Sequence, residues 1–219
     1  MTLKDSEDKT RELGLFNANI IKKVLIEDPI LAKIKKVLPN HLPAVTADIT
    51  FEELDNLNAH IKDPEQKFRK FYVTAFNIET CKTEIFSREH TPKVVIADAV
   101  RASMSIPIFF NHVTIREKNE VTKKFEDRRT LNKKTVVHYL DGGLLDNYPI
   151  WLFDDFKYIL NVEEHMQNDN FSMQNPYTLG FRLVDQNTLI NYVNPKTMPD
   201  EPSKNIHNSF FSTLAQVQL

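Results

Sequence analysis

The stretch VVHYLDGGLLDNYPI, residues 136–150, decides the fold that this sequence predicts. Its first five residues form an apolar run that is typical of a buried strand. Asp141 follows at the end of this strand, and Gly142 and Gly143 follow the acid. Because glycine lacks a Cβ atom, another backbone or a substrate can pass close to Asp141. The triplet alone also fits an ordinary turn, since Asp and Gly are both turn formers.

A second informative stretch, residues 97–110, precedes this strand. Its small residues Ala99, Ala102 and Ser103 predict a helix that packs closely on a sheet, and Pro107 ends that helix. Basic residues between this helix and the strand are interleaved with acids that nearly cancel their charge. We therefore expect a solvated loop or hairpin there rather than a surface that grips anionic lipid.

Helical spacing of apolar residues predicts two short amphipathic helices within residues 20–38. Asp28 and Pro29 are expected to supply the cap and the first-turn proline of the second helix. Both apolar stripes are narrow, so core packing is favoured over a membrane-binding face. Thr50 and Glu53 have the spacing of a capping box and predict the start of another short helix.

The run of apolar and β-branched residues at 71–76 predicts a strand that is covered on both faces. Residues 77–82 are expected to turn the chain, and residues 83–86 to return as the partner strand of a hairpin. The chain thus alternates between helical and strand patterns, which favours a mixed α/β architecture.

Composition limits the class of protein. The chain has 219 residues, of which 41% are hydrophobic and 26% are charged, as expected for one globular domain or part of a larger one. A net charge of -2, without zinc-finger spacing or a Gly-rich phosphate loop, argues against nucleic acid as a partner. Cys81, the sole cysteine, excludes an internal disulfide and is expected to be a small, half-buried thiol. The polar N-terminus resembles no signal peptide, and no apolar run reaches membrane-spanning length, so we expect a soluble protein that is cytoplasmic by default.

Six segments together carry a family resemblance: residues 50–54, 71–78, 86–92, 97–110, 141–150 and 178–183. In this order and at these spacings they resemble the patatin-like phospholipase family, whose members hydrolyse lipid acyl esters through a Ser-Asp dyad. The resemblance extends over residues 14–184. It implies an α/β fold of α/β/α layers around a central sheet, with the N-terminal strands missing. Residues 1–219 would then form a single partial domain, in which 203–219 is a truncated C-terminal helix.

In that family the aspartate of the Asp-Gly-Gly motif pairs directly with the nucleophilic serine. Asp141 is the matching position and would be the proton acceptor, with Gly142 and Gly143 as the glycines of the motif. The implied substrate is a lipid or phospholipid, met at a peripheral membrane surface. No metal or organic cofactor is implied, and the seven histidines show neither triad nor metal spacing.

The sequence departs from the family pattern at the nucleophile, which the family places in a Gly-x-Ser-x-Gly elbow. The four glycines cannot flank a serine at that spacing: Gly14, Gly142, Gly143 and Gly180. Ser103 and Ser105 belong to the helix-exit motif and lack an elbow. We therefore expect the serine on an upstream N-terminal polypeptide, or lost, so that this chain alone is inactive and folds poorly. The alternative is a non-catalytic scaffold that acts as a binding or membrane-interaction module.

Overall fold

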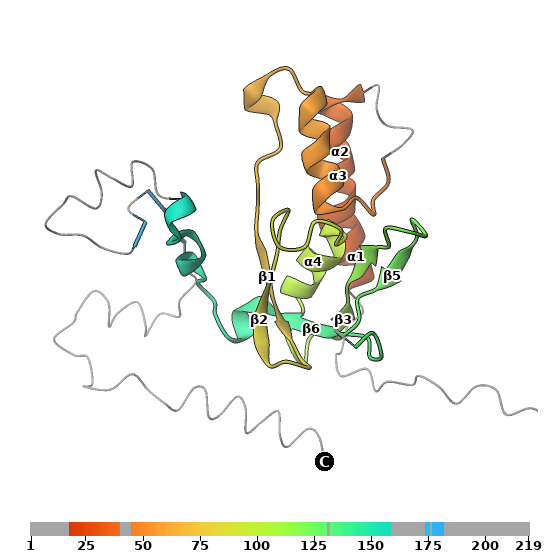
Figure 1. The fold of residues 1–219 in the computed structure, drawn as a ribbon, viewed down its shortest axis with the longest axis vertical. Coiled ribbons are helices and arrows are strands. Elements are labelled where there is room, and N and C mark those ends of the chain that lie inside the picture. The colour runs from red at the N-terminus through yellow and green to blue at the C-terminus, as the bar shows by residue number, and fades with distance from the viewer. Residues whose placement is uncertain (1–17, 40–44, 131, 159–173, 176, 182–219) are drawn as a thin grey trace, which may run out of the picture. The chain divides into compact units, whose positions relative to one another are not determined.

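The computed structural model describes residues 18–39, 45–130, 132–158, 174–175 and 177–181 (Figure 1). The chain divides into two compact units, residues 1–176 and 177–219. Of the second unit, the structure describes residues 177–181, which form no helix or strand. The expected helix at 203–219 lies outside the described residues, and the single domain over 1–219 stays a prediction.

The described part of the first unit starts with one continuous helical segment rather than two capped helices. It consists of α1 (Asn19–Lys22), a π-helical turn (Lys23–Glu27) and α2 (Asp28–Val37). Asp28 has helical backbone angles and is the first residue of α2 rather than its N-cap, which corrects the expected break, whereas Pro29 does lie in the first turn. Proline has no N–H to donate to the carbonyl one α-helical turn before it, and the wider π turn lies directly before Pro29.

Helix α3 (Phe51–Leu57) begins at the predicted capping box. The Glu53 N–H donates to Thr50 Oγ1 over 3.2 Å, and the Thr50 N–H donates to Glu53 Oε2 over 3.0 Å. Two 3-10 turns, Asn58–His60 and Pro64–Gln66, connect this helix to the sheet. The sequence therefore located this helix start correctly.

The central sheet is antiparallel, with strand order β2-β1-β6-β3. Its strands are β1 (Val73–Asn77), β2 (Lys82–Phe86), β3 (Val113–Thr114) and β6 (His138–Asp141). The predicted hairpin of β1 and β2 and the predicted strand before Asp141 are both present. The α/β class is confirmed, whereas the three-layer α/β/α arrangement and the absence of the N-terminal strands stay predictions.

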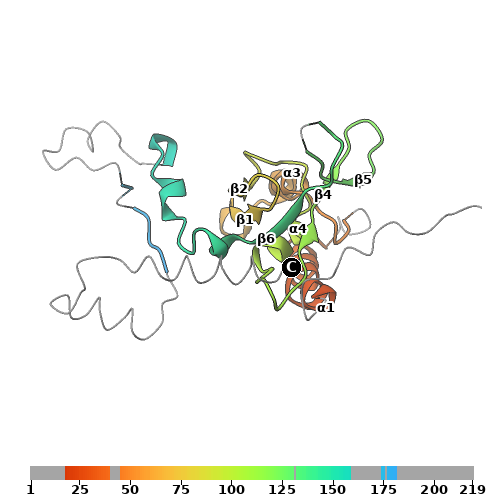
Figure 2. The same ribbon diagram turned by 90° about the horizontal axis from the view of Figure 1, so that it is seen from below.

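Helix α4 (Ile96–Ser103) contacts β1, β3 and β6 on one face of the sheet (Figure 2). Ala99 and Ala102 are fully buried and pack in one core with Ala75 of β1 and Tyr139 of β6. Small side chains let this helix lie close to the strands, as the sequence predicted. Its C-terminal end is thereby brought beside the end of β6.

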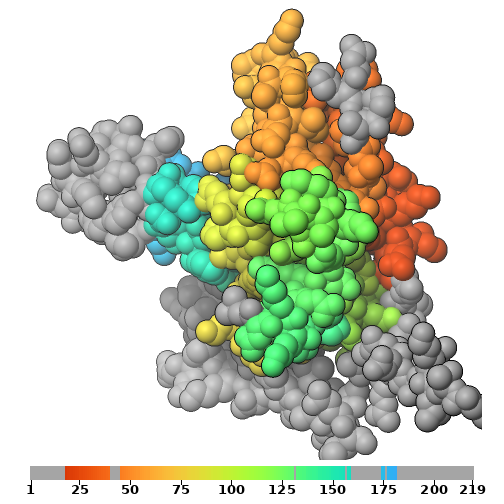
Figure 3. Space-filling model, turned by 45° about the vertical axis from the view of Figure 1, so that its right-hand side comes forward, coloured from red at the N-terminus to blue at the C-terminus, as the bar shows by residue number. Residues whose placement is uncertain are grey.

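The polar segment between α4 and β6 forms the expected hairpin, from β4 (Arg116–Lys118) and β5 (Phe125–Asp127). Space-filling Figure 3 shows this green hairpin against the orange surface that contains α3, and Lys118 and Glu53 form an ion pair there. Three 3-10 turns follow β6: η5 (Gly142–Leu144), η6 (Ile150–Phe153) and η7 (Phe156–Tyr158).

The environment of Cys81 and the lengths of the helices bear on two further expectations from the sequence. Cys81 is exposed and adopts a positive φ of 53° in the turn between β1 and β2, so the expected half-buried thiol is wrong. A residue at the tip of a two-stranded hairpin has no layer above it to cover its side chain. Within the described residues, no helix is both long and apolar enough to cross a membrane.

Candidate active site

Asp141 is the last residue of β6, and the sheet register fixes the direction of its side chain. It lies directly opposite Ala75 of β1, so both side chains lie on the same face of the sheet, the face that α4 covers. The Asp141 N–H donates to the carbonyl of Ser105 over 3.0 Å. This bond ties the strand end to the segment that leaves α4.

The carboxyl group of Asp141 is half-buried and held by one hydrogen bond. The Gly143 N–H donates to Oδ1 over 2.6 Å. Among the residues that the structure describes, no donor bonds to the other oxygen, Oδ2. Burial raises the pKa of Asp141 above its ordinary value, and the bond from Gly143 offsets part of that rise. The result is one fixed and one available oxygen on a carboxylate that is more basic than usual.

The two glycines of the motif are required for space rather than for unusual backbone angles. A Cβ atom on Gly142 would lie 2.3 Å from the carbonyl oxygen of Thr74, and one on Gly143 would lie 3.0 Å from Asp141 Oδ1. Neither glycine has a positive φ. The close passage of another backbone that the sequence suggested is thus the passage of β1 past Gly142.

Gly142→Ala is expected to lower the free energy of unfolding by about 2 kcal/mol, because the new methyl group meets a backbone oxygen that cannot move aside alone. Urea titration followed by circular dichroism measures the loss. Gly143→Ala is the matched control, since its nearest contact is the end of a side chain, and it should cost less. Equal stability of the two variants would contradict this account of Gly142.

The two serines near the end of α4 differ in their surroundings. Ser105 is fully buried, and its hydroxyl donates to the carbonyl of Arg101 over 2.9 Å while accepting from Arg101 Nη1 over 2.6 Å. Its hydroxyl is therefore engaged in holding the helix exit. Ser103 is half-buried and lines a groove next to the strand end.

This groove, of about 280 Å3, lies between the end of α4, the start of β1 and η6. Its lining is mostly apolar. The residues that line it include Tyr72, Thr74, Ser103, Met104, Leu152 and Phe153. Thr74 is also the residue whose carbonyl abuts Gly142. The groove therefore adjoins the Asp-Gly-Gly turn.

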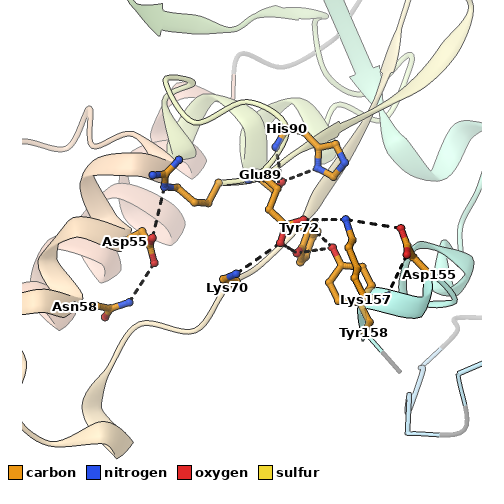
Figure 4. Close-up of polar contacts among 11 residues, drawn as sticks. Asp55, Asn58, Lys70, Tyr72, Glu89, His90, Asp155, Lys157 and Tyr158 are labelled. Atoms are coloured by element: carbon orange, nitrogen blue, oxygen red, sulfur yellow. Dashed lines mark hydrogen bonds and ion pairs between the residues drawn. The ribbon is translucent and has the colours of Figure 1, made fainter. Parts of the chain in front are cut away.

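A polar cluster lies beside the groove and was not found from the sequence (Figure 4). It gathers Lys70, Tyr72, Glu89, Lys157 and Tyr158, with the hydroxyls of both tyrosines directed at the Glu89 carboxylate. These residues come from three separate parts of the chain at irregular spacings, so no sequence pattern could have indicated them.

Histidines and acids form no metal site in the part of the chain that the structure describes, where no group of three or more His, Cys, Asp or Glu could hold an ion. His138, three residues before Asp141, is a strand residue. Its Nδ1 lies 3.1 Å from Glu79 Oε1, and its ring packs edge-on against His112. It belongs to an inner strand of the sheet, between β1 and β3, and its position in the sequence had indicated a strand residue.

Most of the chain is similar in sequence to known proteins. The family model described as patatin-like phospholipase matches residues 10–154, which include Asp141 and exclude residues 178–183. A protein named probable lipid hydrolase 463L, from Invertebrate iridescent virus 6, is 30% identical over 145 residues. Those residues are 66% of this chain and 37% of that protein, so the chain spans only a minor part of the relative's length. No solved structure matches the chain.

Proposed function

The chain belongs to the patatin-like phospholipase family, and on that premise we propose that it supplies the general base of a lipid acyl hydrolase. Asp141 is the base. The observation that carries the proposal is its half-buried carboxyl group at the end of β6, with one oxygen held by Gly143 and a pKa raised by burial. A carboxylate of raised pKa accepts a proton from a serine hydroxyl more readily than an ordinary one does.

The proposed reaction follows from the two oxygens of Asp141. Oδ1 stays bonded to the Gly143 N–H, which fixes the orientation of the carboxyl group, and Oδ2 receives the proton of the serine. The serine oxygen then forms a bond to the ester carbonyl carbon, and the alcohol leaves with the proton that Asp141 returns. A water molecule, deprotonated by the same carboxylate, releases the fatty acid from the acylated serine.

The proposal places the serine outside this sequence, on an upstream segment or a separate N-terminal polypeptide. Ser105 lies two residues after α4, where its hydroxyl is fully buried and bonded to Arg101, and the glycines of the chain provide no Gly-x-Ser-x-Gly elbow. Lipid is the proposed substrate because the groove next to Gly142 is lined mainly by apolar side chains, including Leu152 and Phe153.

The isolated chain is expected to hydrolyse a short-chain nitrophenyl ester no faster than buffer does, because loss of the nucleophile alone costs about a million-fold in turnover of a serine hydrolase. Addition or fusion of a patatin-family segment that carries Gly-x-Ser-x-Gly should restore release of nitrophenol, followed by absorbance. Turnover by the isolated chain that Ser103→Ala abolishes would overturn the assignment, because the nucleophile would then lie in this chain.

A non-catalytic membrane-binding role is the second candidate, and one observation favours it. Three large apolar side chains after α4 are exposed: Ile106 by 48%, Ile108 by 48% and Phe109 by 55%. Ile108 has a φ of 74°, which is unusual for a β-branched residue. The nucleotides upstream of this sequence separate the two candidates, since an adjacent frame for a Gly-x-Ser-x-Gly segment favours the enzyme and an unrelated neighbour favours the binding role.

A further inference from the structure

Two tyrosine hydroxyls and two lysine ammonium groups surround the carboxylate of Glu89, which lies in the turn after β2 (Figure 4), and the two hydroxyls also lie 2.7 Å from each other. The Tyr72 hydroxyl and Lys70 Nζ lie 2.9 Å and 3.7 Å from Oε1. The Tyr158 hydroxyl and Lys157 Nζ each lie 3.0 Å from Oε2. Each oxygen of one small anion thus faces one tyrosine and one lysine.

The two tyrosines are held in place by aromatic packing that does not depend on Glu89. The Tyr72 ring packs edge-on against Phe153 at 5.4 Å and against Tyr158 at 6.0 Å, and Phe153 and Tyr158 lie 5.5 Å apart. Burial, together with the bonds to Tyr158 and Glu89, raises the pKa of Tyr72, so its hydroxyl keeps its proton at neutral pH. The tyrosine part of the site is therefore preorganised, whereas the exposed side chains of Lys70 and Lys157 can adjust to an anion of a different size.

Glu89 is partly open to solvent and does not belong to a regular element. Its side chain is 30% exposed, and it belongs to a turn rather than to a strand or helix. The hydrogen bond from Lys157, and then those from Tyr72 and Tyr158, lower its pKa to about 2 against the effect of burial. Glu89 is therefore ionised at neutral pH, and its negative charge compensates the positive charges of Lys70 and Lys157.

The cluster adjoins the apolar groove through its member Tyr72 and through Phe153, which packs against both tyrosines of the cluster. Tyr72 and Phe153 line the groove that also contains Thr74 and Ser103. An amphipathic molecule whose chain entered this groove would carry its polar end to the tyrosine hydroxyls. A phosphate group offers more negative charge than a carboxylate, and its oxygens can accept from two lysines and two hydroxyls at once.

We propose that Lys70, Tyr72, Lys157 and Tyr158 form a phosphate-binding site that the Glu89 carboxylate occupies in the free protein, and that the phosphate of a lipid headgroup displaces Glu89. The site would select lipids with an accessible anionic phosphate. Its use for a lipid rests on the proposed function, whereas the binding of phosphate itself does not.

The first test is binding of inorganic phosphate to the full chain, measured by isothermal titration calorimetry. Glu89→Gln removes the competing charge but keeps the size of the side chain, so it should bind phosphate about tenfold more tightly. Lys157→Met removes a donor and should bind about tenfold more weakly. Glu65→Gln and Lys62→Met make the same charge changes at exposed positions elsewhere and should leave affinity unchanged.

Opposite signs for the Glu89 and Lys157 variants separate a ligand site from a structural clamp. If the cluster only fastened η7 to β1, both variants would loosen the fold and neither would bind phosphate more tightly. Lys70→Met is a second test in case the Lys157 variant does not fold. The Lys70 side chain is 65% exposed, so its replacement should leave the fold intact and weaken phosphate binding about threefold. Phosphate binding that Glu89→Gln fails to strengthen would overturn the proposal.

The source of the phosphate is tested with vesicles, which require no hydrolysis. Cosedimentation with phosphatidylcholine vesicles that contain phosphatidic acid should exceed that with phosphatidylcholine alone, and Glu89→Gln should increase the difference. Phosphate binding without any preference among vesicles would overturn the headgroup assignment and leave a site for free phosphate. Because neither measurement uses the nucleophile, failure of the proposed hydrolase would not affect them.

Discussion

Asp141→Asn is expected to lower kcat/KM for a nitrophenyl ester by about ten-thousand-fold in a chain completed with a Gly-x-Ser-x-Gly segment. The amide has the shape of the carboxylate and can still accept from the Gly143 N–H, which lies 2.6 Å from Oδ1. It cannot accept a proton from serine, because an amide is not a base at neutral pH. The loss should appear in kcat, with little change in the free energy of unfolding.

Asp146→Asn is the matched control for that variant. This variant makes the same charge change five residues after Asp141. The Asp146 carboxylate accepts from the Tyr148 N–H and from Trp151 Nε1. Its rate should stay within about threefold of the parent, since removal of surface polar contacts costs little. Equal losses in the two variants would show that charge in this segment, not a base at Asp141, supports activity.

The pH dependence of the completed enzyme follows from the raised pKa of Asp141. The base must be ionised, so kcat/KM should rise with pH through that pKa and level off above it. Because burial raises the pKa above the ordinary aspartate value of 3.8, the rising limb should lie at higher pH than for a solvated carboxylate. A limb at the ordinary value would be inconsistent with Asp141 as the half-buried base.

Features that arise from neighbouring residues could be predicted from the sequence. The capping box of Thr50 and Glu53 is complete within four residues. The strand before Asp141 follows from a local apolar run, and the close-packed helix follows from its small residues. The end of that helix was expected at Pro107, but α4 already ends at Ser103. The α/β class and the family followed from the order of such segments.

Features that depend on contacts between distant segments could not be predicted. Tyr72 and Tyr158 meet across 86 positions, and their hydroxyls lie 2.7 Å apart. The residues that line the groove likewise follow neither a helical nor a strand period in the sequence. The base was found because its motif is local, whereas the groove and the cluster beside it exist only after the chain has folded.

The contacts of the buried acid Asp98 could not be predicted either, because the sequence indicated only that this residue belongs to a helix. Asp98 is 5% exposed and lies in the first turn of α4. It accepts from Arg116 Nε over 2.7 Å and Nη2 over 3.0 Å, from the Arg116 N–H over 3.1 Å, and from Lys22 Nζ over 2.5 Å. One carboxylate thus joins α4 to β4 and to α1.

Asp98→Ala is expected to lower the free energy of unfolding by about 3–5 kcal/mol, because it leaves two cations and a backbone N–H without their buried acceptor. Small domains are typically stable by about 5–15 kcal/mol in total, so the variant should unfold at a much lower urea concentration. Asp127→Ala removes an exposed aspartate of β5 that accepts from the Thr114 hydroxyl, and it should cost at most about 1 kcal/mol.

The difference between the parent and Asp98→Ala should itself depend on pH. Burial alone would raise the pKa of Asp98, but the hydrogen bonds and charges of Arg116 and Lys22 outweigh it and lower that pKa below the ordinary 3.8. A lowered pKa contributes stability above the unfolded value, and this contribution is lost as pH falls through the folded value. The urea midpoints of the two proteins should therefore converge in the acid range. A gap that stayed constant would mean that Asp98 stabilises the fold by packing rather than by its charge.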